Sequence, residues 1–232
     1  MRDSWKKQIL YKGFVELMSH TEDGDLLVVN AARCSFDKEH EDLDSDKDGK
    51  LINYLAKHKH LLPFRHPVCT LRIHAPLFVL RQLGKHQVGF SWSEVSRRYI
   101  DSDPDFYYPL PQEWRERAPN IKQGSTKTQL SNEDAAIVDG KVDGLYCEAV
   151  ATYDKMLELG VSPEQARMVL PQAMFTTTVT TGSLLGWHHL YKLRTDEHTQ
   201  LETQEYANAV GEIMSELFPI SWRALGCNEK IV

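Results

Sequence analysis

The sequence predicts an α+β fold in which a twisted, mainly antiparallel sheet is flanked by helices. An early segment alternates apolar and polar residues with the period of a strand, and the second half repeats apolar residues at helical spacing. The chain has 232 residues, of which 41% are hydrophobic and 26% charged, which is typical of a globular protein. We expect a single domain over residues 1–232.

The first elements follow from local patterns. Residues 50–60 form a short helix with apolar Leu51, Ile52 and Leu55. Residues 68–76 alternate, with Cys69, Leu71 and Ile73 on one face and Thr70, Arg72 and His74 on the other, as in a strand with one dry face. The proline that follows suits the first turn of a helix over residues 76–86.

The second half is mainly helical. An irregular excursion over residues 101–134 precedes a helix over residues 138–156, which Gly160 ends. A capping box at residues 162–165 opens a short helix, and the β-branched residues 176–182 form an extended segment. Helices over residues 182–194 and 195–219 follow. The last helix turns five apolar residues inward: Leu201, Val210, Ile213, Met214 and Leu217.

Bulk composition excludes several classes of protein. A net charge of -6 disfavours general nucleic-acid binding, which uses a basic face. No apolar run reaches the length of a membrane span, and the first residues do not resemble a secretory signal. The four cysteines are scattered without a Cys-x-x-Cys pair, so we expect reduced thiols and a cytoplasmic protein.

Residues 81–99, RQLGKHQVGFSWSEVSRRY, concentrate positive charge in this acidic chain. In a helix, Arg81 and Lys85 lie one turn apart, as do Gln82 and His86. The stretch combines serine hydroxyls with guanidinium groups, a donor set that suits a phosphate. It therefore predicts a site for a specific anion.

The same stretch carries a family signature. Lys85-His86-Gln87, eight residues and then Ser96-Arg97-Arg98-Tyr99 resemble the Arg-His-Arg, seven residues, Ser motif of the flavin-dependent thymidylate synthases. The resemblance continues in order along most of the chain, in KGFVEL, AARCSF, residues 58–82, ARMVLP, residues 189–207 and the closing LFP. Such a collinear set is stronger evidence than a short motif.

The resemblance implies a function and an assembly. Members of the family methylate dUMP to dTMP with methylenetetrahydrofolate as carbon donor, and NADPH supplies reducing equivalents through a bound FAD. The resemblance also implies a homotetramer whose active sites are shared between subunits. It implies no membrane or nucleic-acid partner.

The resemblance also assigns residues. Arg194 is the expected catalytic residue, close to the uracil ring. The expected dUMP contacts are Gln82, Lys85, Glu94, Val95, Ser96, Arg97, Arg98, Arg167 and Arg194, with Arg167 reaching over from a neighbouring subunit. The expected FAD contacts are Leu62, Lys85, His86, Gln87, Glu94, Ser183 and His189, and His60 lines the same pocket. We interpret Ser96 as a ligand and not a nucleophile, because its neighbours are arginines, which are no bases.

The chain departs from the family pattern on the flavin side. Lys85 and Gln87 replace two arginines, and the spacer before Ser96 is one residue longer. Ser183 and Leu185 stand where other members often carry asparagine and arginine. The residues that keep the family's types are Glu94, Ser96, Arg98, Arg167 and Arg194, so the contacts to uridylate are the safer transfer.

Other interpretations stay open from the residues alone. Ten histidines allow a metal site, although no His-Glu-x-x-His pattern appears. DSDKDG faintly resembles a calcium loop, but Leu55 stands where the closing glutamate is expected. Arginines with Trp92 and Tyr99 allow a nucleic-acid module. A flavoprotein that binds a uridine nucleotide without methylating it is the nearest alternative.

Overall fold

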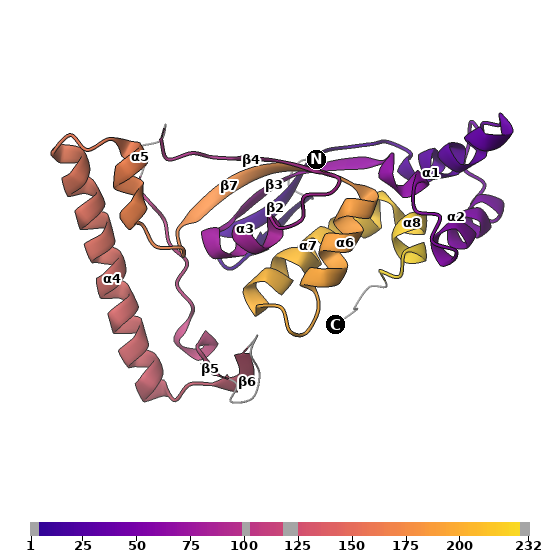
Figure 1. Cartoon of the computed structure of the whole chain (residues 1–232). Helices are drawn as coiled ribbons and strands as arrows, with labels where there is room; N and C mark the ends of the chain where they lie inside the picture. The colour runs from indigo at the N-terminus through magenta and orange to yellow at the C-terminus, as the bar shows by residue number, and fades with distance from the viewer. Residues whose placement is uncertain (1–4, 99–102, 118–124, 228–232) are drawn as a thin grey trace.

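The computed structural model describes residues 5–98, 103–117 and 125–227. Its centre is a five-stranded sheet in the order β1-β2-β3-β7-β4, and all four neighbouring pairs are antiparallel (Figure 1). The strands are β1 (Lys6–Ile9), β2 (Gly13–His20), β3 (Val68–Pro76), β4 (Phe90–Glu94) and β7 (Phe175–Ser183). The predicted antiparallel sheet is therefore confirmed.

Helices lie at both ends of this sheet and across one of its faces (Figure 1). They are α1 (Gly24–Arg33), α2 (Lys47–Lys57), α3 (Leu77–Leu83), α4 (Asn132–Glu158), α5 (Pro163–Ala166), α6 (Leu184–Arg194), α7 (Leu201–Leu217) and α8 (Pro219–Ala224). Short 3₁₀ turns are η2 (Cys34–Phe36), η3 (Pro63–Arg65), η4 (Pro111–Glu113) and η5 (Arg167–Val169), and a small second sheet pairs β5 (Arg115–Arg117) with β6 (Ser125–Gln129).

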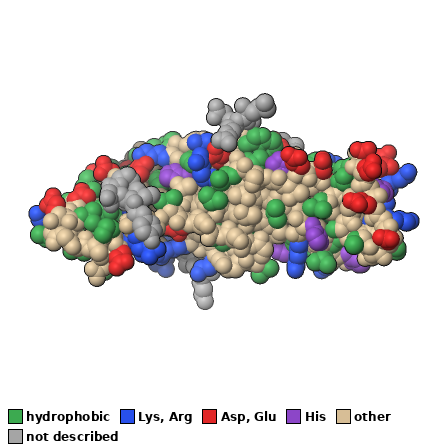
Figure 2. Space-filling view, turned by 90° about the horizontal axis from the view of Figure 1, so that it is seen from above, with side chains coloured by type: hydrophobic (Ala, Val, Ile, Leu, Met, Phe, Trp, Pro, Cys, Tyr) green, Lys and Arg blue, Asp and Glu red, His purple; other side chains and the backbone are tan. Residues whose placement is uncertain are grey.

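The two faces of the sheet differ as the alternation in β3 predicts. Cys69, Leu71 and Ile73 are fully buried toward the helices. The open face, on the other side, carries Thr70, Arg72 and His74 from β3 and, opposite them in the register, Thr181, Val179 and Thr177 from β7. Figure 2 looks at the molecule from above, and its middle is mostly tan, the colour of uncharged polar side chains and backbone.

Aromatic side chains tie the helices to the buried face. The ring nitrogen of Trp187 in α6 donates a hydrogen bond to the Cys69 carbonyl at 3.1 Å. The hydroxyl of Tyr206 in α7 donates to the His74 carbonyl at 2.8 Å. Gly13 in β2 makes room for that hydroxyl, because a Cβ there would lie 1.8 Å from it. These two hydrogen bonds thus fix where α6 and α7 lie relative to the sheet.

Several local expectations need correction. Helix α3 ends at Leu83 and α7 begins only at Leu201, so both are shorter than the patterns predict. Leu201 is 46% exposed and does not face inward, because it lies in the first turn of α7. The hydroxyl of Ser162 contacts the Gln165 side chain at 3.4 Å and caps no backbone group. The sequence patterns do not predict the N-terminal strands β1 and β2.

Side chains of the irregular excursion that precedes α4 pack against that helix. Phe106, Tyr146 and Met174 form a second small apolar cluster beside the main core. The ring nitrogen of Trp114 donates to Asp139 at 2.6 Å. Arg115 pairs with the buried Glu202 at the start of α7, at 2.7 Å. The excursion is therefore held to both α4 and α7.

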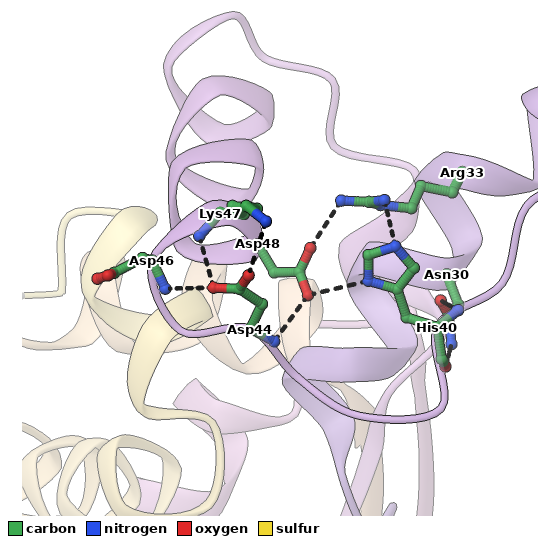
Figure 3. Close-up of polar contacts among 7 residues, drawn as sticks. All are labelled: Asn30, Arg33, His40, Asp44, Asp46, Lys47 and Asp48. Carbon is green, nitrogen blue, oxygen red and sulfur yellow. Dashed lines mark hydrogen bonds and ion pairs between the residues drawn. The ribbon is translucent and has the colours of Figure 1, made fainter.

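A buried ion pair fixes the loop between α1 and α2 (Figure 3). The Asp48 carboxylate is fully buried, and it accepts from Arg33 at 2.7 Å and from the Asp44 backbone at 3.0 Å. His40 lies between Arg33 and Asp48, and Asn30 exchanges two hydrogen bonds of 2.9 Å with the His40 backbone. Because Arg33 can only donate, its bond to the Nε2 atom requires the other ring nitrogen of His40 to donate to Asp48.

The same contacts bear on the calcium interpretation of this loop. The Asp44 carboxylate accepts from the backbone of Asp46 and Lys47 at 3.1 and 3.0 Å, where α2 begins. These backbone hydrogen bonds, led by that of Lys47, lower the pKa of Asp44. Asp48 is engaged with Arg33. Two of the three aspartates thus have structural roles in the described chain.

Replacing Asp48 by alanine should destabilise the fold strongly, because Arg33 would keep a half-buried charge without its partner. Loss of one member of a buried pair costs about 3–5 kcal/mol of unfolding free energy. Urea denaturation measures it, and the exposed Asp46→Ala is the matched control with a change under about 0.5 kcal/mol. Equal stabilities of the two variants would contradict the role of this ion pair.

Candidate active site

Five of the expected site residues lie where α3, the turn after it and the end of α6 meet: Gln82, Lys85, His86, Gln87 and Arg194. Helix α3 ends directly before Gly84, and the chain turns back through residues 84–89 into β4. Gly89 has a φ of +79°, which favours glycine. The Trp92 ring nitrogen donates to the His86 carbonyl at 3.0 Å. The turn is therefore fixed to the strand that follows it.

Arg194 is the centre of this arrangement. It is the last residue of α6, and its Nη2 atom donates to the backbone carbonyl of Gln82 at 2.7 Å. Its Nε atom donates to Nε2 of His86 at 3.2 Å. Burial lowers the pKa of the guanidinium without removing its charge at pH 7. One residue thus contacts an expected nucleotide position and an expected flavin position.

The Arg194 contact defines the state of His86. Because the guanidinium only donates, the Nε2 atom of His86 must accept, and the ring proton must lie on Nδ1. Burial, followed by the charges of Arg194 and His189, lowers the pKa of His86 to about 4. The ring is therefore neutral at pH 7 and has one N–H group left to donate.

The flavin-side residues extend from His86 toward η3, which packs against α6. His189 has a pKa lowered by burial and then by the charges of Arg65 and Lys192. Leu62 is 66% exposed and directly precedes η3. This combination of imidazole N–H groups, an arginine and a lysine is a donor set that fits a dinucleotide diphosphate. Sequence reasoning missed Arg65, since only its approach to His189 in space reveals it.

Three of the residues expected at the flavin contact other parts of the protein in this structure. The Ser183 hydroxyl is buried and accepts from the Gly186 backbone at 3.1 Å, so it caps α6. The Gln87 amide donates to the Gly84 carbonyl and closes the turn. The His60 ring lies 6.2 Å from that of Tyr54 at the end of α2. Their contacts to FAD stay predictions.

The phosphate-side residues follow β4. The Val95 backbone donates to Thr177 at 2.9 Å and so continues the pairing with β7. The Ser96 hydroxyl accepts from the Arg98 backbone at 3.4 Å and from its Nε atom at 3.3 Å. These donors are no bases, which agrees with a ligand role for Ser96. Arg97 is half-buried beside them, and Tyr99 of the signature lies outside the described residues.

Glu94, at the end of β4, has cations near it. Partial burial raises the pKa of its carboxyl, while the charges of Arg167 and Arg81 oppose that change. Arg167 in η5 therefore lies near Glu94 of its own chain, although its Nε atom donates to Glu164 at 3.3 Å. Whether it also serves a second subunit stays a prediction. Arg81 belongs to the stretch that was expected to bind an anion, although it was not assigned as a dUMP or FAD contact.

Gln82 and Arg194 line a cavity of about 470 Å³. It is also lined by Leu193, Asp196, His198, Thr199 and Gln200. The exposed Lys85 is two residues beyond α3. A larger cavity of about 860 Å³, between β1, α6 and α7, contains none of the expected site residues. The smaller cavity is lined by two of the expected site residues, Gln82 and the catalytic candidate Arg194, and we take it as the part of the site beside Arg194.

Buried thiols and the grouping of possible metal ligands bear on the other interpretations of the sequence. Burial raises the pKa of Cys227 to about 12 and that of Cys69 further still, so neither is a thiolate at pH 7. Within residues 5–98, 103–117 and 125–227, no three His, Cys, Asp or Glu side chains are grouped to hold a metal ion. None of the helices in these ranges is long and apolar enough to span a membrane.

Comparison with known proteins places the chain in a family. The family model described as thymidylate synthase complementing protein matches residues 16–220. The flavin-dependent thymidylate synthase of Thermotoga neapolitana is 36% identical over 219 residues, covering 94% of this chain and 93% of the relative. That of Thermus thermophilus is 37% identical over 216 residues, covering 93% and 76%.

A solved structure shares the fold. The UMP/dUMP methylase PolB from Streptomyces cacaoi, bound with 5-Br dUMP, superposes with a TM-score of 0.82 at 29% identity. The match covers 93% of this chain and 95% of that one. With the family model spanning most of the chain and relatives of this identity over nearly its whole length, the chain belongs to the flavin-dependent thymidylate synthase family.

Proposed function

We propose that this protein reductively methylates dUMP at C5 of uracil to give dTMP, with FAD as its cofactor. The observation that carries the proposal is Arg194, which joins an expected uridylate residue, Gln82, to an expected flavin residue, His86, in one hydrogen-bonded unit. This arrangement supports a site in which nucleotide and flavin lie side by side. Methylenetetrahydrofolate and NADPH are the proposed carbon donor and reductant.

The chain's own residues supply binding, orientation and charge. Ser96, Arg97, Arg98 and Arg167 hold the phosphate, which they can neutralise next to the sheet edge. A guanidinium fixed by two hydrogen bonds favours negative charge on the uracil ring, and this makes C5 more nucleophilic. Because Arg194 is held before substrate binds, little reorganisation is needed during the reaction.

The cofactor's place is supported by the donor set on the flavin side. His86, His189 and Arg65 would hold FAD, with Leu62 against its apolar parts. FAD, when bound, supplies the hydride that reduces the transferred carbon. The neutral His86 can orient a ring acceptor with its Nδ1–H group and adds no second positive charge beside Arg194.

The comparisons also bear on whether the substrate is a ribonucleotide or a deoxyribonucleotide. The structural neighbour is named a UMP/dUMP methylase, and its structure bound with 5-Br UMP matches this chain with a TM-score of 0.78. The relatives of highest identity among those above are thymidylate synthases, which favours the deoxyribonucleotide. Parallel assays with UMP and dUMP decide between the two.

We also propose a homotetramer with shared active sites. Apolar side chains are exposed on α4 and near its end, among them Ile137 at 58%, Leu145 at 61%, Leu159 at 72% and Met168 at 77%. Surfaces of this kind are usually covered by a partner. Light scattering that gave the 26.7 kDa mass of one chain would contradict the assembly.

The direct test reduces the FAD-loaded protein under anaerobic conditions and then adds dUMP and methylenetetrahydrofolate. We expect flavin reoxidation together with stoichiometric dTMP. A protein that binds dUMP and FAD but yields no dTMP would support the alternative of a uridine-binding flavoprotein without methylation. A protein with no spectral response to dUMP would contradict both.

Arg194→Ala should reduce dTMP formation by at least about a hundredfold, the loss typical for one group that stabilises charge in a transition state. The absorbance of bound flavin should persist. Arg223→Ala, in the exposed part of α8, is the matched control and should keep the parent rate. An Arg194→Ala protein as active as this control would remove Arg194 from the mechanism.

His86 should titrate far below an ordinary histidine. Its lowered pKa means that the folded chain binds its proton less readily than the unfolded chain, so this group's contribution to stability is lost as the pH falls from 6.5 toward 4. Long-range ¹H–¹⁵N spectra of histidine-labelled protein should show a neutral ring with the proton on Nδ1 at pH 6. Arg194→Met should raise the pKa in part, because burial is the larger cause, and titration near 6.5 in the parent would contradict a ring buried beside the Arg194 charge.

A further inference from the structure

Gln200 is the partner of the Gln82 side chain. The Nε2 atom of Gln82 donates to Oε1 of Gln200 at 2.7 Å, and both residues line the 470 Å³ cavity with Arg194. The Gln82 backbone carbonyl is held by Arg194 at the same time. Backbone and side chain of Gln82 are therefore both fixed, by residues more than a hundred positions away in the chain.

The backbone of Gln200 is itself well anchored. It lies directly before α7, and its carbonyl accepts from Thr203 and Gln204 at 2.9 and 3.0 Å. The Gln204 amide donates to Thr199 at 2.7 Å, and the Thr199 hydroxyl donates to Leu193 at 3.0 Å. The turn that carries Gln200 is thus closed on both sides before any nucleotide binds.

A carboxamide is directional, so its partner decides what it offers to a ligand. With one N–H of Nε2 donated to Gln200, the oxygen of Gln82 is left as an acceptor on the opposite side of the carboxamide from that bond, and the second N–H is the remaining donor. The N3 position of uracil is a donor, whereas the N3 position of cytosine is an acceptor. An oxygen facing N3 binds uracil and leaves cytosine with two opposed lone pairs, a mismatch that is costly in a confined site.

We infer that Gln200 is a positioning residue that holds Gln82 in the orientation that selects uracil over cytosine. The inference deepens the proposed function and rests on it, because it takes the base to lie beside Arg194 in this cavity. Gln82 is the residue that contacts the base. Gln200 acts through it and does not itself need to touch the nucleotide.

The test compares the affinities of dUMP and dCMP for the full-length, FAD-loaded protein. Gln200→Glu can only accept, so it keeps Gln82 in place and should keep the parent's preference for dUMP. Gln200→Met is of similar length but apolar. It should reduce the preference for dUMP, measured as the dissociation constant of dCMP divided by that of dUMP, by about tenfold. Gln200→Lys can only donate and should reduce the ratio further, by turning the Gln82 oxygen away from the base.

The controls separate this inference from the proposed function. Gln165→Met, on the surface at α5, should leave the ratio unchanged. If Gln200→Met and Gln200→Lys keep the parent ratio, or weaken both nucleotides equally, Gln82 does not read the base and the inference is wrong. If the parent binds no dUMP, the proposed function fails first.

A second readout needs no nucleotide. The side-chain NH₂ signals of Gln82 should show one hydrogen-bonded proton in the parent and in Gln200→Glu. That proton should lose its downfield shift in Gln200→Met. An unchanged signal in Gln200→Met would show that Gln200 does not hold Gln82 and would overturn the inference.

Discussion

The two hydrogen bonds from Arg194 to the end of α3 and the turn after it are the contacts on which the site depends. They bring together residues 82, 86 and 194, which belong to a helix end, a turn and a second helix end. A helix ends with carbonyl groups that lack partners within the helix, and a guanidinium satisfies them well. The same group keeps a fixed positive charge beside a neutral imidazole, so one side chain serves structure and electrostatics together.

The sheet gives this arrangement its precision. β3 and β7 pair over their full lengths, and β4 joins the same sheet on the other edge of β7. Because α3 follows β3, and α6 follows β7, the antiparallel pairing sets where both helices start. Trp187 and Tyr206 then bond to β3 carbonyls from the helical side. The register of β3 and β7 thus sets where α6 begins, and with it the position of Arg194 at the end of α6.

What the sequence could predict was local. Strand β3 and the stop at Gly160 follow from alternation and from one glycine, and they are confirmed. The resemblance named Arg194, Gln82 and His86 but could not say that they touch. The pairing of Gln82 with Gln200, and the approach of Arg65 to His189, depend on chain segments that meet only after folding. The prediction that Leu201 faces inward is wrong, because helical spacing shows which face of a helix is apolar but not which turn of that helix is covered by other elements.

β4, which leads into the signature arginines, is an edge strand with a single neighbour in the sheet. Its Ser91 and Ser93 are exposed, and such polar residues keep an edge from pairing with other chains. An edge strand also opens at lower free energy than a central one. The residue pairs between β4 and β7, from Phe90 with Gly182 to Glu94 with Thr178, therefore hold the start of the signature arginines to the sheet.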